Sequence, residues 1–448
     1  MENERQRTIV EAIDLTHDAL GVCKLEDGYT VFVAGMLKGE RADIDVTERK
    51  KSYGFGKIVE MIEKSPYRVA PKCKHYDICG GCGLMHMDYD IQVSFKKYRI
   101  ETTLKRAGLE TVRVNDMVGM INPYNYRNKI EIKFQNGEKG LEAGFFQAKS
   151  HNLVNLEECH IMPKRIFDLI VLIKNIANEL GIKAFDESAG TGVIKSAVIR
   201  ESSKTKQLSL LLHLATDELP NRDTFVKKII AKIPEVVSIA ISMTNDESSL
   251  SIDPIRIIHG ADGLIDAVGD LDFFIGHRSF FQTNAIQTEK LFHQAIDYAG
   301  LTGKEKIIDA YCGIGSIGLF AASKAYKVFG IELIKSAIID ARRNTELNGI
   351  KNAFFEVGEA EEVIQKWRKF KFDVIFVDPP RKGCDEALLQ AIIDMKISKV
   401  VYVSCDPATL VRDLKILAAG GYNVEETTPF DMFPQTAHVE SVSLLSLK

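Results

Sequence analysis

The period of the hydrophobic positions changes along the chain and divides it into three parts. Over residues 1–66, apolar positions alternate with polar ones in five short runs, which is the period of half-buried strands. Two of these runs, Gly21–Leu25 and Tyr29–Val33, flank an Asp27-Gly28 pair that predicts a hairpin. Five short strands in so little sequence predict a small closed barrel of the OB-like type, a frequent nucleic-acid platform.

The middle part mixes the periods of helices and strands. An amphipathic helix is predicted over 90–108, and its polar face is expected to carry five basic side chains: Lys96, Lys97, Arg99, Lys105 and Arg106. Further on, the pattern predicts helices and strands in alternation, an α+β domain: strands at 129–134, 141–146, 193–199, 208–214 and 236–242, and helices at 164–180 and 223–232. Residues 122–129 interleave tyrosines with Arg127 and Lys129, a composition typical of RNA-stacking surfaces.

From about Gly276 onward, strands and helices alternate regularly. Asn284 is a plausible cap for the first helix of this part. Continuous apolar runs, typical of buried parallel strands, end at Asp309, Glu332, Val377 and Ser404. The pattern predicts a C-terminal α/β domain with a Rossmann-like sheet, closed by strands at 422–429 and 439–447.

Composition restricts the class of protein. The 448 residues exceed what one core accommodates, and no apolar run approaches the roughly 18 residues of a membrane span. With no apolar signal core near Met1, we expect a cytoplasmic protein whose 8 cysteines stay reduced. The net charge of −4 gives no global nucleic-acid signature, but residues 49–106 hold 13 Lys and Arg against 6 Asp and Glu.

Three cysteines lie close together after the predicted barrel. Cys73, Cys79 and Cys82 are separated by glycines that let the backbone wrap a cluster, and Cys159 follows well downstream. Four thiolates suit tetrahedral zinc or an iron–sulfur cube. Structural zinc usually shows two paired Cys-x2-Cys units, so we favour a 4Fe–4S cluster over zinc, in a structural or RNA-platform role.

Two strand ends carry the most reactive side chains. Cys405 follows a buried strand within Ser-Cys-Asp-Pro, and Asp378 opens Asp-Pro-Pro after another. Ligands of open α/β sheets lie outside the carboxyl ends of the strands, so both side chains are expected in one crevice. A buried structural cysteine is the alternative for Cys405.

A glycine-rich turn precedes them in the same sheet. The spacing of Gly313, Gly315 and Gly318 fits either NAD or S-adenosylmethionine, and Glu332 suits the ribose diol of both. Asp309 before the turn is more typical of methyltransferases, and the Asp378 and Cys405 loops favour the methyl donor.

The motifs together resemble a known family. Asp-Pro-Pro-Arg-Lys-Gly at 378–383, Ser-Cys-Asp-Pro at 404–407, Phe-x-Gln-x-Asn at 280–284 and His-Val-Glu at 438–440 look like those of the bacterial 23S rRNA (uracil-5-)-methyltransferases. The resemblance covers essentially the whole chain. The N-terminal part resembles the TRAM domain, through Gly21-Val22, Val31-Phe32-Val33 and Lys38-Gly39-Glu40.

The resemblance implies a chemistry that the residues can explain. C5 of uracil is too weak a nucleophile to take a methyl group unaided, and a thiolate adding to C6 activates it. Cys405 is the expected nucleophile and Glu440, by resemblance, the base that removes the C5 proton. The remaining implied residues fall into two sets. Those lining the cofactor site are Gln282, Tyr311, Ser316, Glu332, Glu359 and Asp378; those binding the uracil are Gln282, Asp378 and Arg381.

The resemblance also suggests a substrate and a division of the chain. The related tRNA enzymes generally lack the barrel and the four cysteines, so we expect 23S rRNA as the partner, with tRNA as the alternative. A non-catalytic RNA-binding or ribosome assembly factor is the third reading. Nothing indicates an obligate protein partner. The expected domains are a TRAM-like barrel (1–66), a central metal-cluster domain (67–90 and 122–275) and a methyltransferase domain (91–121 and 276–448).

Overall fold

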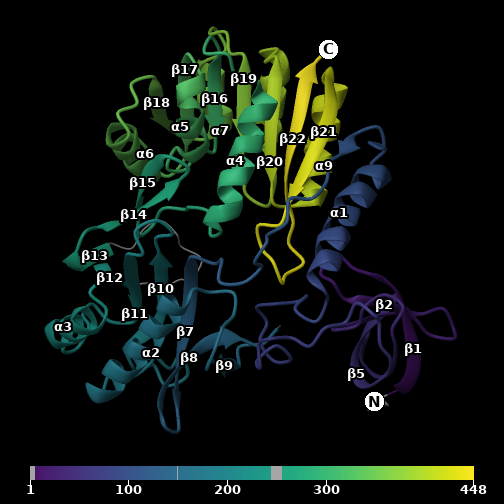
Figure 1. Cartoon of the computed structure of the whole chain (residues 1–448), viewed down its shortest axis with the longest axis vertical. Coiled ribbons are helices and arrows are strands. Elements are labelled where there is room, and N and C mark those ends of the chain that lie inside the picture. Colours follow the sequence, from purple (N-terminus) through teal and green to yellow (C-terminus); the bar gives the residue numbers. More distant parts are fainter. Residues whose placement is uncertain (1–5, 149, 244–254) are drawn as a thin grey trace.

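The computed structural model describes residues 6–148, 150–243 and 255–448. Three bodies are visible in Figure 1: a small barrel, a central sheet with helices, and a larger sheet above them. No helix within these described ranges is long and apolar enough to cross a membrane.

The N-terminal part is a closed five-stranded barrel, as the alternating pattern predicted. Its strands are β1 (Gln6–Leu15), β2 (Gly21–Lys24), β3 (Thr30–Val33), β4 (Arg41–Arg49) and β5 (Tyr53–Glu63), in the order β1-β2-β3-β5-β4. The predicted hairpin joins β2 to β3: Gly28 has a φ of 81°, and the Asp27 carboxylate accepts a hydrogen bond of 2.9 Å from the Tyr29 amide. Alternate side chains such as Val31, Val33 and Ile44 fill the interior.

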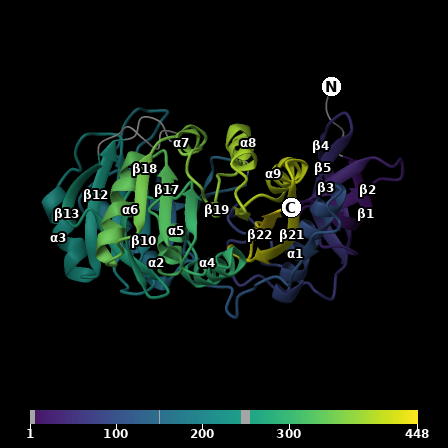
Figure 2. The ribbon, with the colours of Figure 1, turned by 90° about the horizontal axis from the view of Figure 1, so that it is seen from above.

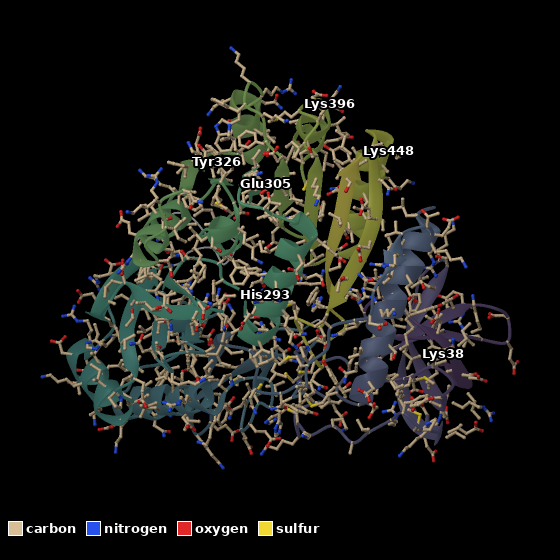
Figure 3. The ribbon with its side chains drawn as sticks, turned by 45° about the horizontal axis from the view of Figure 1, so that its top comes forward. Lys38, His293, Glu305, Tyr326, Lys396 and Lys448 are labelled. Carbon is tan, nitrogen blue, oxygen red and sulfur yellow. The ribbon has the colours of Figure 1, made fainter. Side chains whose placement is uncertain are left out.

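Helix α1 (Tyr89–Arg106) connects the barrel to the largest sheet. The barrel leaves a groove against α1, lined by Leu37 and Lys38 on one side and Phe95 and Tyr98 on the other; Figure 3 labels Lys38 at this junction. The prediction that Lys96 lies on the polar face is wrong, because its side chain is completely buried and forms an ion pair with Asp431.

The central part is a seven-stranded mixed sheet, in the order β13-β12-β11-β10-β7-β8-β9. Helix α2 packs on β8 and β10, and α3 packs on α2 and β12, so one face is covered by an apolar core. The strand β13 and the parallel pairing of β11 with β12 were not predicted. The element bounds are β7 (Lys129–Gly137), β8 (Gly140–Phe146), β9 (Leu153–Asn155), α2 (Lys164–Glu179), β10 (Ile194–Glu201), β11 (Leu208–Leu214), α3 (Arg222–Lys232), β12 (Val236–Met243) and β13 (Ile255–Gly260).

The C-terminal part is an eight-stranded sheet in the order β18-β17-β16-β19-β20-β22-β21-β6. The first five of these strands are parallel, and β22 runs antiparallel to β20. The strands are β16 (Lys306–Ala310), β17 (Lys327–Glu332), β18 (Ala353–Val357), β19 (Val374–Val377), β20 (Lys399–Ser404), β21 (Tyr422–Phe430), β22 (Glu440–Leu447) and the short edge strand β6 (Arg113–Val114).

Helices cover both faces of this sheet, as expected of a doubly wound fold. Figure 2 shows α4 on one face and α7, α8 and α9 on the other. Two apolar cores follow from this arrangement, one on each face. The helices are α4 (Ala285–Ala299), α5 (Ser316–Ala321), α6 (Lys335–Leu347), α7 (Ala360–Lys366), α8 (Glu386–Asp394) and α9 (Pro407–Ala419). Asn284 caps α4 as predicted, accepting a hydrogen bond from the Gln287 amide.

A hairpin that was not predicted lies between the two larger sheets. Its strands, β14 (Gly263–Val268) and β15 (Leu271–Gly276), pair only with one another. The amide of Phe274 donates to Asn344 of α6 at 2.6 Å, and Phe273 belongs to the core of the C-terminal sheet.

Candidate active site

Two adjacent parallel strands deliver the predicted pair of side chains. In the ladder of β19 and β20, Val377 pairs with Tyr402, so Asp378 and Cys405 follow the ends of neighbouring strands. Asp406 then caps α9, accepting hydrogen bonds from two amides at 2.8 and 3.0 Å, and Pro407 is the first helical residue. The abrupt change from strand to capped helix fixes the backbone that carries Cys405.

Glu440 reaches the same place from the antiparallel neighbour. Ser404 pairs with Ser441 in the β20–β22 ladder, so one further step in this register sets Cys405 opposite Glu440. The Glu440 side chain is buried, and its Oε2 has no hydrogen-bond partner within the described residues. Burial, together with the charge of Asp378, raises the pKa of Glu440 to about 8.

The loop before Glu440 is held by α1, which is distant in sequence. Lys96 donates to Asp431 at 2.6 Å with both side chains buried, and Tyr89 donates to the other Asp431 oxygen at 2.9 Å. Gln92 and Gln435 exchange two hydrogen bonds of 3.1 Å. Figure 1 shows this loop, in yellow between β21 and β22, descending to where the three bodies meet.

The surroundings of Cys405 keep its thiol protonated in the free protein. Burial raises the pKa of Cys405 to about 11, and the charges of Glu440 and Asp378 act in the same direction. The exposed Arg381 opposes them, because its positive charge favours the thiolate. Burial also raises the pKa of Asp378 to about 7. Glu440, Asp378 and Arg381 therefore all lie within electrostatic reach of the Cys405 thiol.

The glycine-rich turn lies at the end of the neighbouring strand β16. Tyr311 has a φ of 64°, in the left-handed region that a residue with a side chain rarely adopts, and such strain concentrates at ligand sites. Gly313 and Gly315, with φ of 54° and 80°, supply the turn before α5. Asp309 is buried and accepts from the Gly318 amide at 2.7 Å; burial raises its pKa to about 7.

The other side chains expected at a cofactor surround this turn. Glu332 accepts from the Gly313 amide at 3.1 Å and from the Ile334 amide at 2.9 Å, so it braces the turn. Ser316 is the first residue of α5. Glu359 precedes α7 and is exposed, next to Gly358, whose amide donates to the Glu332 carbonyl. Gln282 is nearly buried before α4.

The four predicted metal-ligand cysteines line one small cavity, although they come from distant segments. Cys73, Cys79, Cys82 and Cys159 all face it, beside His160 and Met85. All four are free thiols. Burial raises the pKa of Cys82, and the charges of the other three cysteines act in the same direction. Among the described residues, no three His, Cys, Asp or Glu side chains are positioned around a single metal ion.

One expected RNA-facing aromatic is instead part of a core. Tyr126 is buried, and its hydroxyl donates to the Pro434 carbonyl at 2.9 Å, so it supports the loop before Glu440. Tyr124 remains partly exposed, with the Lys72 ammonium 4.1 Å from its ring centre. The sequence pattern did not predict which of the two tyrosines is buried, because both lie in the same polar stretch.

Four features define the class of protein. They are the order of the strands in the sheet, the glycine turn after β16, the acid at the end of β17 and the Asp-Pro-Pro loop after β19. They are the features of a methyltransferase that uses S-adenosylmethionine. Comparisons with known proteins agree. A family model for tRNA (uracil-5-)-methyltransferases matches residues 268–448, and a TRAM domain model matches residues 1–59.

Relatives extend the match to the whole chain. An uncharacterized RNA methyltransferase of Halalkalibacterium halodurans is 44% identical over 439 residues, covering 97% of this chain and 96% of the relative. One of Bacillus cereus is 44% identical over 438 residues, with 97% and 95% covered. The crystal structure of Pyrococcus abyssi tRNA (uracil-54, C5)-methyltransferase with S-adenosyl-L-homocysteine superposes with a TM-score of 0.78 at 29% identity, covering 98% of this chain and 99% of that one. The protein belongs to the TRAM-containing family of RNA uracil-5-methyltransferases. It is an enzyme that transfers a methyl group from S-adenosylmethionine to C5 of uracil in RNA.

Proposed function

We propose that the substrate is an unpaired uridine of 23S rRNA, converted to 5-methyluridine through a covalent bond between Cys405 and C6. The observation that carries the covalent route is the convergence of Cys405, Asp378 and Glu440 at three adjacent strand ends. C5 methylation of a pyrimidine needs a nucleophile and a general base, which a thiol and a buried carboxyl side by side can supply.

The residues divide the reaction into steps. The Cys405 thiol gives its proton to solvent water, and the thiolate forms a bond to C6, which moves electron density through the ring to C5 and O4. Arg381 and Gln282 stabilise the charge on O4, while Asp378 accepts from the uracil N3–H. C5 then bonds to the methyl group while the bond between that group and the donor sulfur breaks, which leaves S-adenosylhomocysteine. Glu440 removes the C5 proton, the electron pair re-forms the C5–C6 double bond, and the carbon–sulfur bond breaks to return the thiolate.

The cofactor site fits S-adenosylmethionine, which supplies the methyl group when bound. Glu332 lies at the end of β17, where an acid meets the ribose diol in this fold, and Tyr311 and Ser316 border the strained turn. Gln282, Glu359 and Asp378 complete the expected set. The φ of 64° at Tyr311 supports this assignment, because backbone strain persists where a ligand requires the conformation.

The four cysteines are proposed to hold a 4Fe–4S cluster, with zinc as the second choice. The support is chemical: four reduced thiols line one cavity, and a metal-bound cysteine is a thiolate whose charge the metal compensates. The cluster's role would be structural, because it ties residues 73–82 to Cys159 in the central part.

Transfer RNA is the second candidate substrate, and a specific observation favours it. The Pyrococcus abyssi enzyme that superposes on this chain along nearly its whole length is a tRNA methyltransferase, so the presence of the N-terminal part does not by itself distinguish the two RNAs. The argument for rRNA rests on the barrel together with the four cysteines, which the related tRNA enzymes generally lack.

One experiment separates the candidates. The purified protein is given tritiated S-adenosylmethionine with unmodified 23S rRNA or with unmodified bulk tRNA. We expect label in the rRNA, at 5-methyluridine after nuclease digestion and chromatography. Label in tRNA alone would overturn the substrate assignment, and label in neither RNA would refute both.

A further inference from the structure

Two cations face each other on the central sheet with no anion between them. Lys129 of β7 and Arg200 of β10 are direct partners in the antiparallel ladder. Directly opposite residues project from the same face of a sheet, and like charges in these positions destabilise it. The fold tolerates this repulsion at the strand end nearest the active site.

The Arg200 guanidinium is buried and incompletely satisfied. Its side chain is 5% exposed, its Nη1 has no hydrogen-bond partner within the described ranges, and its Nη2 makes one long bond of 3.4 Å to the Ser279 carbonyl. Guanidinium N–H groups left unpaired in the interior cost stability. The Arg200 guanidinium can therefore donate further hydrogen bonds to an acceptor that binds beside it.

The neighbouring acids do not fill this role. Asp266 is the acid whose charge acts on Arg200, but it forms no ion pair with it, and its Oδ1 accepts bonds from Ser202, Ser203 and Lys204. Glu131, the acid that acts on Lys129, pairs with Lys133 at 3.1 Å. In the part of the chain that the structure describes, no acid lies within 4.0 Å of the Lys129 ammonium or the Arg200 guanidinium.

A third cation adds to the same field. Burial, the charge of Arg200 and, to a smaller extent, the charge of Arg127 together lower the pKa of Lys129 to about 8. Lys129 and Arg127 are both partly exposed, so solvent reaches part of each side chain, whereas Arg200 is buried. Three positive charges lie together here, and no acid among the described residues is in contact with Lys129 or Arg200, so the place favours an anion.

The site adjoins the residues that receive the uridine. Asn128, between Arg127 and Lys129, donates its amide to the Thr283 carbonyl at 2.8 Å and its side chain to the Gln282 carbonyl at 3.5 Å. RNA that inserts a uridine beside Gln282 must carry the flanking backbone past this point. We propose that Lys129 and Arg200 bind a phosphodiester group of the substrate RNA next to the flipped uridine. This inference rests on the proposed function.

If Lys129 binds a phosphate, its removal should weaken RNA binding and its salt dependence but should not lower the stability of the protein. Loss of one phosphate contact to single-stranded RNA lowers the slope of log K against log salt by about 0.7, which is roughly fivefold in affinity at 0.1 M salt. Removing one of two facing like charges relieves repulsion in the free protein. Lys129→Gln should therefore bind RNA more weakly while its melting temperature stays unchanged or rises.

The test uses equilibrium binding of the full-length protein to a 12-nucleotide oligouridine between 50 and 300 mM KCl, a design that needs no turnover. Lys129→Gln and Arg200→Gln should each lose about 0.7 in slope, and Lys129→Arg should restore it. Lys227→Gln, which removes an exposed charge from α3 at the outer edge of the central part, is the matched control and should keep most of the slope. Affinity for S-adenosylmethionine should stay unchanged in all four.

Two results would overturn the inference. One is an unchanged slope with a lower melting temperature in Lys129→Gln, since that describes a purely structural pair. The other is stabilisation of the wild type by inorganic phosphate with no change in the RNA slope of either variant, since the site would then take a free anion. The proposed function is tested separately, by labelled methyl transfer to RNA with the wild type. A failure of the phosphate site can therefore be told apart from a failure of the proposed function.

Discussion

Removing one partner of the buried ion pair between Lys96 and Asp431 should strongly destabilise the methyltransferase sheet. Both side chains are completely buried at 2.6 Å, so removing one partner leaves the other without compensation. Breaking such a pair typically costs about 3–5 kcal/mol. We expect Lys96→Met and Asp431→Asn each to lower the free energy of unfolding by about that amount.

The chain provides a reporter and a matched control. Trp367 is the only tryptophan, and it packs against Phe329 and Phe372 of this sheet, so its fluorescence during urea unfolding follows this part of the protein. Lys97, the next residue of α1, pairs with Asp116 at 2.7 Å, but Asp116 is fully exposed. Lys97→Met should therefore cost less than about 1 kcal/mol.

The double variant Lys96→Met with Asp431→Asn completes the cycle. It removes both charges and should recover much of the loss, because neutral replacement of a buried pair is often well tolerated. Additive losses in the double variant, or losses below about 1 kcal/mol in the single ones, would refute the reasoning. The loop also positions Glu440, so the single variants should accumulate the covalent RNA adduct in a quench assay, whereas Lys97→Met should not.

Three further predictions concern the buried acids and the thiols. The pKa of Glu440 rises from an ordinary value near 4.5 to about 8, so between these pH values the folded state holds one proton more than the unfolded chain, and stability falls as pH rises through the interval. Glu440→Gln should not show this loss, so urea unfolding at pH 8.5 should find it more stable than the wild type by roughly 3–5 kcal/mol. At pH 4.5 the two proteins should be about equally stable. An equal difference in unfolding free energy at both pH values would contradict the raised pKa of Glu440. The pKa of Cys405, raised to about 11, predicts slow alkylation by iodoacetamide at pH 7.5 and a steady increase up to pH 10; peptide mapping of a rapidly labelled Cys405 at neutral pH would disprove it. Anaerobically purified protein should contain iron and sulfide, and Cys159→Ala should lose both and melt at a lower temperature. Cys23→Ala, which changes a cysteine of the barrel core, is the control and should keep the metal. Equal iron content in the two variants would exclude the proposed set of four cysteine ligands.

Sequence patterns predicted those features that local physics determines. The barrel followed from short alternating runs and an Asp-Gly turn, and the C-terminal sheet from apolar strands that end just before Asp378 and Cys405. The predicted cap at Asn284 depends on neighbouring residues alone. Each of these signals acts over a few residues, so the sequence displays it directly.

Features that depend on distant residues could not be predicted in this way. Lys96 has the polarity of a surface residue, and only the approach of Asp431, 335 positions away, makes its burial possible. Tyr126 likewise becomes part of a core because Pro434 accepts its hydroxyl. The facing pair of Lys129 and Arg200 depends on the register between β7 and β10, which no local pattern encodes.

The central claim is that the Cys405 sulfur bonds to C6 of the target uracil. RNA in which 5-fluorouridine replaces uridine tests it most directly, because Glu440 can remove a proton from C5 but not a fluorine. After incubation with S-adenosylmethionine and 5-fluorouridine-substituted 23S rRNA, the account predicts a protein–RNA complex that survives denaturation and maps to the peptide containing Cys405. Methylation of the unsubstituted RNA without any such complex, or an undiminished complex with Cys405→Ala, would contradict it.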